Sequence, residues 1–129
     1  TMRIALETTA LERAIPNLQS SDLIRARGVL EILDEEEAPT QWSELNWEFH
    51  ATLYQASGLP RLLATIQTLH NNVARYLIIY LDRLSAQNLS QQEHWAIFRA
   101  CKSRDIDAAN RLLTAHLRKA SEGVMAFLA

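Results

Sequence analysis

Three of the chain's four histidines lie on apolar faces of predicted helices, and their combination indicates metal binding. His50, His94 and His116 each stand among apolar residues at helical spacing, so three helices direct one imidazole each toward the interior. Asn46 lies one turn before His50 and points the same way. A buried imidazole needs a partner for both ring nitrogens, and a divalent metal ion supplies one partner common to all three rings.

A second interpretation stays open, in which each histidine is a buried side chain that is hydrogen-bonded to a neighbouring group. That is the usual interpretation of a single histidine on an apolar stripe. It becomes less favourable for three histidines and an inward-facing amide, because every unpaired buried polar atom costs stability. The fourth histidine, His70, has an ambiguous direction on its helix, so we place it outside the metal set as a candidate cavity-lining residue.

Other kinds of metal or thiol chemistry lack their signatures in this sequence. There is no His-Glu-x-x-His segment of the kind that zinc proteases use, and no pair of Glu-x-x-His segments of the kind that di-iron bundles use. Cys101 is the single cysteine, which excludes a disulfide framework and a thiolate cluster. It shares a helix face with His94, and its simplest role is that of a small buried hydrophobic residue.

Composition limits the chain to a few protein classes. Its 129 residues, 48% of them apolar, suffice for one domain with a single core. The formal net charge of −2 argues against nucleic-acid binding by this segment itself. The longest apolar run, "YLIIYL", is too short to span a membrane, and no signal-peptide pattern is visible at the start. We therefore expect a cytoplasmic protein without a membrane partner.

Helical periodicity recurs along the whole chain without strand-like alternation, and only three glycines and three prolines interrupt it. This pattern predicts an all-α fold, a single-domain antiparallel bundle of about six helices. The first helix is expected over Met2–Ala14, because Pro16 disfavours helix in the residue before it. The third helix should end at the glycine stop Ser57-Gly58, and the fourth should begin at Pro60.

The remaining helix starts are predicted from capping residues, which bond to the free backbone N–H groups of a first turn. A Ser-x-x-Glu capping box at Ser90 and Glu93 predicts the start of the fifth helix. The second helix is expected to have Ser20 or Ser21 as its cap and to end near the acidic run 34–37. Thr40 is the expected cap of the third helix. Ser103 or Asp105 is the expected cap of the sixth helix, which should end near residue 127.

Taken in order, the motifs resemble one known protein family. The segment Asn46-Trp-Glu-Phe-His50, the pair Glu93-His94 and the segment Ala-His116-Leu are similar to motifs of the FCD domain, the ligand-binding C-terminal domain of GntR-type bacterial transcription regulators of the FadR branch. The resemblance covers essentially the whole chain. The sequence departs from the family pattern at three places: Asn46 replaces the usual aspartate, Leu59 stands where asparagine is common, and Ser103-Arg104 replaces the usual glycine region of the turn before the last helix.

The resemblance implies a divalent metal ion at the floor of an effector pocket inside the bundle. Its ligands would be Asn46, His50, His94 and His116, and zinc or nickel suits a site rich in imidazole. The oxygen of an asparagine carries no charge, so this departure predicts a weaker or differently selective site. The coordination positions left over would take water or the carboxylate of a small organic acid.

A carboxylate effector also needs cationic or hydrogen-bonding groups beside the metal, and a guanidinium can hold a carboxylate with two parallel bonds. Arg3 and Arg75 are the first candidates, because their helices resemble those of the family and Arg3 forms an Arg-x-x-x-Glu pattern with Glu7. Asn72 and Tyr76 are secondary candidates. The alternative for either arginine is a solvated surface charge.

These features favour a sensor, in which a small carboxylate effector reshapes the bundle and alters DNA binding by a winged helix-turn-helix domain that we expect to precede this chain. The resemblance implies a homodimer, and twofold proteins pair with palindromic operators. Two alternatives stay open. One is a small mononuclear metal-dependent enzyme with Glu93 as the nearest candidate base, and the other is a metal-free helical interaction module.

Overall fold

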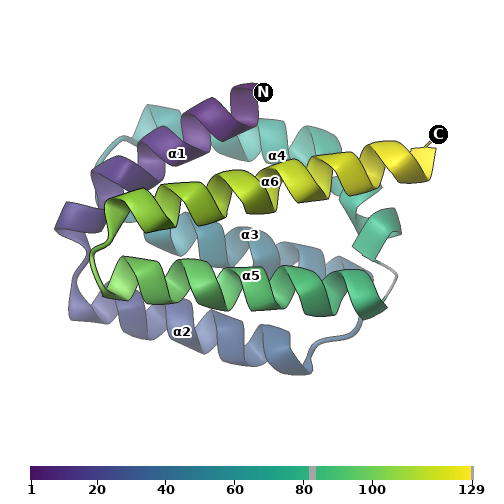
Figure 1. The fold of residues 1–129 in the computed structure, drawn as a ribbon, viewed down its shortest axis with the longest axis horizontal. Coiled ribbons are helices and arrows are strands. Elements are labelled where there is room, and N and C mark those ends of the chain that lie inside the picture. The colour runs from purple at the N-terminus through teal and green to yellow at the C-terminus, as the bar shows by residue number, and fades with distance from the viewer. Residues whose placement is uncertain (82–83, 129) are drawn as a thin grey trace.

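The computed structural model describes residues 1–81 and 84–128, and within them all regular secondary structure is helical. Its α-helices are α1 (Met2–Ala14), α2 (Ser20–Glu35), α3 (Pro39–Tyr54), α4 (Pro60–Leu81), α5 (Leu84–Lys102) and α6 (Ile106–Leu128). Short 3₁₀ turns at Ile15–Asn17 and Gln55–Ser57 follow α1 and α3. The predicted all-α bundle of about six helices is therefore confirmed (Figure 1).

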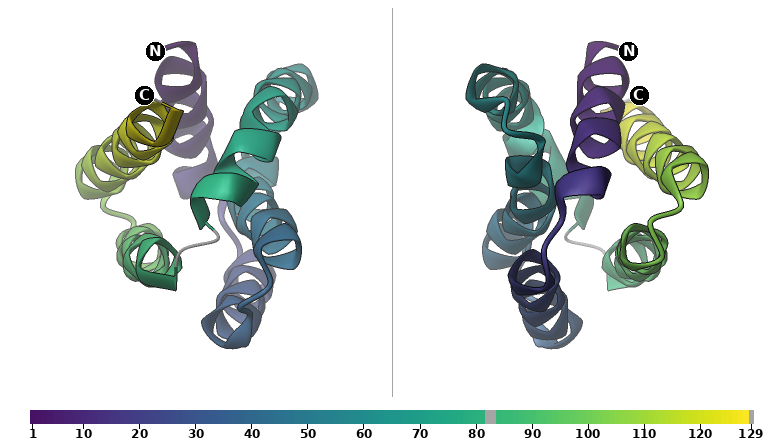
Figure 2. Two further views of the ribbon diagram at one scale, coloured as in Figure 1. Left: turned by 90° about the vertical axis from the view of Figure 1, so that its right-hand side faces the viewer. Right: turned by 90° about the vertical axis from the view of Figure 1, so that its left-hand side faces the viewer.

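Successive helices run in alternating directions, which makes the bundle antiparallel (Figure 1). α5 and α6 lie side by side on one side of the bundle, and α2, α3 and α4 form the other side (Figure 2). α1 packs against α6, α4 and α3. The interior between these two sides holds the candidate site. Within the described residues, none of the helices is both long and apolar enough to cross a membrane.

α3 supplies much of the core and positions half of the candidate site. Trp42, Phe49 and Leu53 are almost fully buried, and their spacing of seven and four residues puts them on one side of the helix. Asn46 and His50 lie among them and are buried as well. The apolar burial that docks α3 into the bundle therefore also fixes the direction of its amide and its imidazole.

Several predicted boundaries are confirmed. α1 spans Met2–Ala14 and α4 begins at Pro60. Gly58 follows the turn after α3 with φ of 68°, a left-handed conformation that glycine adopts without a steric penalty. Asp105 caps α6, since its Oδ1 accepts a hydrogen bond from the backbone N–H of Ala108 at 3.1 Å.

The predicted caps of α2 and α3 are wrong. Gln19, rather than Ser20 or Ser21, precedes α2, and its backbone N–H donates to Oδ2 of Asp22 at 2.9 Å. α3 begins with a proline one residue before Thr40, so Thr40 lies inside the first turn. Proline needs no partner for a backbone N–H at the first helical position, which makes a side-chain cap less necessary there.

The predicted start of α5 is also wrong, and this correction changes the site. α5 begins at Leu84, so Ser90 and Glu93 lie inside the helix and form no capping box. A Ser-x-x-Glu pattern is as compatible with a helix interior as with a helix start, because the local sequence does not show where the preceding turn lies. The Glu93 carboxylate is consequently available to side chains of α6.

The turn between α5 and α6 shows how the chain forms this turn without the glycine that is usual in the family it resembles. Arg104 has φ of 60°, in the left-handed region that disfavours residues with a side chain. Its guanidinium donates to the backbone oxygens of Ile15 at 2.8 Å and Leu18 at 2.6 Å. These two charge-assisted bonds tie the turn to the segment after α1 and offset the backbone strain.

We expect Arg104→Ala to lower the free energy of unfolding by about 2–4 kcal/mol, because it keeps the strained backbone and removes both hydrogen bonds. Arg104→Gly should be about 1 kcal/mol more stable than the alanine variant, because glycine relaxes the left-handed backbone. Urea denaturation followed by circular dichroism measures both values. Arg111→Ala, at an exposed position of α6, is the control and should stay within about 0.5 kcal/mol of the parent. A parent-like Arg104→Ala protein would contradict the proposed tie.

Candidate metal centre

Three histidines from three helices meet inside the bundle. His50 comes from α3, His94 from α5 and His116 from α6, and all three side chains are buried. Their ring centroids are 4.7 to 5.3 Å apart, and one nitrogen from each ring lies within 4.8 Å of the other two. The structure thus brings together the three histidines that the sequence analysis placed in one site.

Aromatic rings of α3 hold this cluster in place. Trp42 stacks on His94 with ring centroids 5.6 Å apart, and Phe49 lies 5.0 Å from the same ring. Phe49 also packs edge-on against His50 at 5.1 Å. Neighbours this close restrict rotation of the imidazoles, so their nitrogens are oriented before any ligand arrives.

Two of the histidines have a strong acceptor at Nδ1, and this leaves Nε2 for a metal. His116 donates through Nδ1 to Oε1 of Glu93 at 2.7 Å, and His94 donates through Nδ1 to Oε1 of Gln91 at 3.0 Å. A hydrogen bond from one ring nitrogen fixes the tautomer and presents the other nitrogen as a lone pair. Both rings are therefore set up as Nε2 ligands.

The Gln91 amide is itself fixed by bonds that reach α2. Its Nε2 donates to the backbone oxygen of Leu30 and to Oδ1 of Asp34, both at 2.8 Å. Trp95 donates to the same Asp34 oxygen at 2.9 Å. With its nitrogen held by two acceptors, the Gln91 amide has to turn its oxygen toward His94.

The third histidine has a weaker link of the same kind. Nδ1 of His50 lies 3.5 Å from the hydroxyl of Tyr54, which donates to Oε1 of Glu7 at 2.6 Å. Glu7 lies on α1 and is fully buried. The phenol and the carboxylate thus connect the histidine cluster to the first helix.

Two buried atoms of the predicted ligand set lack a hydrogen-bond partner among the described residues. They are Oδ1 of Asn46 and Nε2 of His94. An unpaired buried polar atom costs about 1–3 kcal/mol, and native proteins leave few of them. A metal ion bound by the three histidines would be a partner for Nε2 of His94, and Asn46 lies one turn before His50 on α3, so the residues present fit the ion that the sequence analysis predicted.

The burial of His50 and His94 keeps these two rings in the form that binds a metal. Burial lowers the pKa of His50 and His94 well below the usual value, and the charge that neighbouring histidines would carry lowers it further. Both rings therefore stay neutral near pH 7, which coordination requires. Burial alone would raise the pKa of Glu93, but its bonds to His116 and Lys119 outweigh this and hold the pKa below its usual range.

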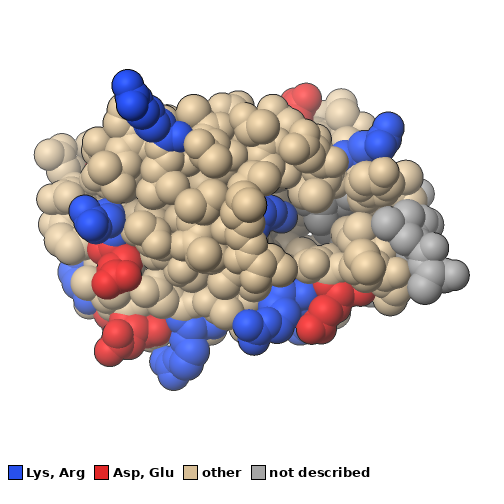
Figure 3. Space-filling view, turned by 90° about the horizontal axis from the view of Figure 1, so that it is seen from above, with Lys and Arg blue, Asp and Glu red and all other residues tan. Residues whose placement is uncertain are grey.

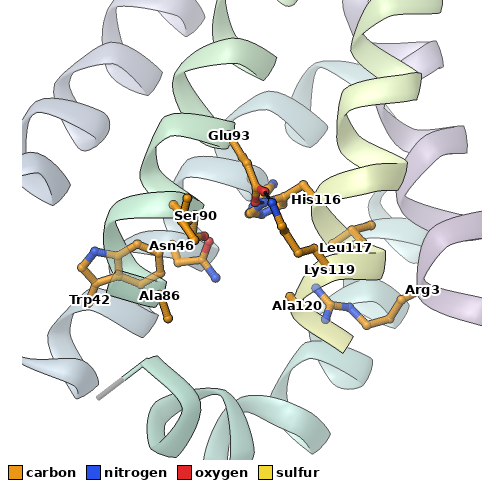
Figure 4. A pocket seen from close by; sticks show the side chains of 12 residues that line it. Arg3, Trp42, Asn46, Ala86, Ser90, Glu93, His116, Leu117, Lys119 and Ala120 are labelled. Atoms are coloured by element: carbon orange, nitrogen blue, oxygen red, sulfur yellow. Dashed lines mark hydrogen bonds and ion pairs between the residues drawn. The ribbon is translucent and has the colours of Figure 1, made fainter. Parts of the chain in front are cut away.

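A cavity of about 50 Å³, here called the histidine cavity, opens beside the cluster and is lined by Asn46, His50, His116 and Arg3 among others. Asn46 and Arg3 extend into it from opposite sides (Figure 4). Nε of Arg3 is bonded to Oε2 of Glu7 at 2.9 Å, and its terminal nitrogens have no partner among the described residues. The cavity has room for a handful of water molecules or one small polar group.

The structure separates the predicted effector-binding residues. Tyr76 lies in a groove that Arg3 also lines. Asn72 and Arg75 are exposed on α4 and line neither the histidine cavity nor that groove. Arg75 instead donates to the hydroxyl of its neighbour Tyr76 at 3.0 Å. An effector-binding role of Asn72 and Arg75 therefore has no support from their position, whereas Arg3 lies where such a role needs it.

His70 and Cys101 are structural residues in this arrangement. His70 stacks on Trp47 with ring centroids 5.0 Å apart and does not line the histidine cavity. Burial, together with the charge of Arg3, lowers the pKa of His70 to about 4. Cys101 is buried, and this burial raises the pKa of its thiol to about 12, so it packs as a neutral small residue as predicted.

Sequence reasoning missed two residues that orient the ligands. The Ser-x-x-Glu pattern indicates a helix cap at Glu93, and no motif in the sequence points to Gln91. The available signal was their spacing, because Gln91 lies three residues before His94 on one helix face, and a carboxylate next to a buried histidine is a candidate partner for another. That signal does not identify His116 as the partner of Glu93.

Comparisons with known proteins add to this geometry. The family model of the FCD domain matches residues 1–119. The chain is 29% identical over 126 residues to the HTH-type transcriptional repressor RspR of Escherichia coli K12, covering 95% of this chain and 55% of that protein. It is 31% identical over 130 residues to the HTH-type transcriptional repressor NanR of Klebsiella aerogenes, covering 93% of this chain and 47% of that protein.

Solved structures are similar as well. A GntR family transcriptional regulator from Pseudomonas syringae pv. tomato aligns with a TM-score of 0.89 at 31% identity, over 98% of this chain and 54% of that one. The Escherichia coli protein McbR/YncC aligns with a TM-score of 0.87 at 20% identity, over 97% and 65%, which shows a common fold. The chain spans about half the length of the curated relatives named above.

The buried histidines predict a loss of stability in acid. The pKa of His70 falls from an ordinary 6.5 to about 4 on folding, so between these values the unfolded chain binds a proton that the folded chain does not. The free energy of unfolding therefore has its full value above pH 6.5 and decreases as the pH falls toward 4. His70 alone accounts for about 3 kcal/mol of this decrease. Urea titrations of the metal-free chain at several pH values measure this. His70→Gln should flatten the pH dependence by that amount, and an unchanged slope would contradict the assignment.

Proposed function

The chain belongs to the FCD domain family of GntR-type transcription regulators, and on this premise we propose that it senses a small organic acid at an internal divalent metal site. The proposal rests on two buried atoms, on Asn46 and His94, that have no hydrogen-bond partner among the described residues. His50 and His116 each offer a further ring nitrogen close to that of His94. A regulatory, ligand-sensing role agrees with relatives that are named as transcriptional repressors.

Zinc or nickel suits the proposed ligand set of Asn46, His50, His94 and His116, because both metals accept imidazole nitrogen. The uncharged amide of Asn46 attracts the ion less than an aspartate would, so we expect moderate affinity. Bound there, the ion would supply a Lewis acid that attracts a carboxylate. The chain's own contribution is orientation, since Glu93 fixes the ring of His116 through Nδ1.

Two cations at the histidine cavity support a carboxylate as the effector. The terminal nitrogens of Arg3 are available there, and a guanidinium can bind a carboxylate with two parallel bonds. Lys119 also lines the cavity, but its Nζ lies 3.2 Å from Oε2 of Glu93 and is engaged in that ion pair. Arg3 is therefore the cation that we expect to contact the effector directly.

Binding at this site would connect helices that are distant in sequence. The proposed metal ligands come from α3, α5 and α6, whereas Arg3 comes from α1. An acid that bridges the metal and Arg3 prefers the arrangement of α1 that places the guanidinium over the cavity, and so shifts the population toward it. We propose that this shift acts in a cytoplasmic homodimer, on winged helix-turn-helix domains that bind DNA.

The two alternative functions are less well supported. A metal-dependent enzyme needs a free general base, and Glu93, the candidate by sequence, has one oxygen bonded to His116 and the other to Lys119. A metal-free interaction module leaves the buried atoms of Asn46 and His94 without partners. A turnover screen of the zinc-loaded chain with organic acids tests the enzyme, and a metal analysis of the purified chain tests the metal-free module.

We expect His116→Ala to weaken zinc binding by more than the roughly 10- to 100-fold that the loss of an outer hydrogen-bond partner costs, because a coordinating nitrogen is removed. Isothermal titration calorimetry on chelator-treated protein measures the Kd. His70→Gln is the matched control, since it removes a buried histidine outside the cluster, and it should keep the parent Kd. A His116→Ala protein that binds zinc as tightly as the parent would exclude the site.

Asn46 is tested by two substitutions in the same titration. Asn46→Asp should bind zinc more tightly, since it adds a negative charge to the ligand set, and Asn46→Ala should bind it more weakly. Unchanged affinity in Asn46→Ala would exclude the amide as a ligand.

Acetate should raise the melting temperature of the zinc-loaded chain and leave the stripped chain unaffected. An equal effect of acetate on both forms would contradict the proposed effector binding.

A further inference from the structure

The histidine cavity adjoins a larger and mainly apolar groove, and we propose that the effector is a monocarboxylic acid whose hydrocarbon tail lies in this groove. The apolar groove is formed by α1, α4 and α6 and is lined chiefly by Met2, Leu69, Val73, Leu117, Val124 and Met125. The inference rests on the proposed function, because the histidine cavity is taken to hold the carboxylate.

The two cavities share part of their lining. Arg3, Leu117 and Ala120 line both the histidine cavity and the apolar groove. These three residues lie together on the side of the histidine cavity that is opposite Trp42 (Figure 4). The two cavities are therefore neighbours, and a ligand that extends from the histidines past Arg3 would reach the apolar groove.

The two cavities differ in volume, so each of them suits a different part of the acid. The histidine cavity measures about 50 Å³ and the apolar groove about 520 Å³. Small-molecule sites usually measure about 300–1,000 Å³, so the histidine cavity alone is too small for an organic acid much larger than acetate. It has room for a carboxylate, and the remainder of the acid then has to occupy the groove.

The chemistry of the lining determines the kind of tail. The inner end carries Arg3, whose terminal nitrogens suit a carboxylate, and the outer part is lined by side chains such as Val73, Val124 and Met125. Hydroxyl groups of a sugar acid would face these apolar side chains and lose their hydrogen bonds to water. A hydrocarbon tail instead removes the apolar surface of the groove and its own apolar surface from water.

The groove lies on the face formed by α1, α4 and α6. This face is largely uncharged and shows a hollow with a basic side chain at its edge (Figure 3). A second copy of the chain, or a segment preceding Thr1, could also cover an apolar groove. Neither occupant accounts for a cation and the histidine cavity next to one end of the groove, whereas a carboxylate with an apolar tail accounts for both ends.

The test is a series of acids of increasing length with the zinc-loaded chain. Calorimetry with acetate, butanoate, hexanoate and octanoate should show the Kd falling about three- to fourfold for each added methylene until the groove is filled. Gluconate is the matched control, because it has the six carbons and single carboxylate of hexanoate but carries hydroxyl groups. It should bind no better than acetate.

Two substitutions connect the effect to the groove. Met125→Asp places a charge at an exposed groove position and should abolish the gain with chain length while leaving acetate binding unchanged. Ile24→Asp on α2 is the matched control, since Ile24 is 71% exposed against 66% for Met125 and lies outside the groove. Val73→Trp fills the groove and should weaken octanoate binding but not acetate binding.

The outcomes separate the inference from the proposed function. If acetate binds but added methylenes bring no gain, the tail assignment is overturned and the metal-and-carboxylate proposal stands. If zinc binds but none of these acids does, the effector part of the proposed function is wrong. If length has no effect and Met125→Asp converts a dimer to a monomer in light scattering, the groove is an interface between copies of this chain.

Discussion

Three imidazoles buried in one core are the constraint on which the rest of this structure depends. Each ring needs a partner at each nitrogen, and the chain supplies a partner for each Nδ1. The partners of His50 and His94 lie on the same helix as the ring, whereas the partner of His116 lies on another helix. Glu93 serves His116, and Gln91, held by α2, serves His94. A polar network of this kind is stabilising only when every member is satisfied. The members that stay unsatisfied among the described residues face the proposed metal site, so coordination of an ion would complete the network.

The fold and the three histidines could be predicted from the sequence because both depend on local periodicity. Apolar spacing defines which face of a helix is buried, and a histidine on that face points inward whatever the neighbouring helix is. The position of one helix against another is not a local property. For this reason the sequence indicates a cap at Glu93, which instead bonds across to α6, and it favours Arg75 as strongly as Arg3, although Arg75 faces solvent.

Two of the departures from the family pattern, at Arg104 and Asn46, involve non-local interactions. Arg104 accepts a left-handed backbone because carbonyl oxygens of Ile15 and Leu18, far back in the chain, receive its guanidinium. Asn46 differs from Arg104, because its side-chain oxygen has no protein partner among the described residues. In the first case the compensation is visible in the fold, and in the second the proposed metal ion would supply it. Neither compensation can be inferred from the residues adjacent in sequence.

The metal and the effector would have different structural roles in this domain. The proposed metal ligands belong to α3, α5 and α6, so an ion alone would consolidate the interior without contacting α1. α1 reaches the cluster through Glu7, which accepts hydrogen bonds from both Tyr54 and Arg3. A carboxylate bound to the ion and to Arg3 would add a second tie between α1 and the cluster. Because only this tie depends on the acid, the position of α1 is the variable through which the acid can act on the rest of a regulator.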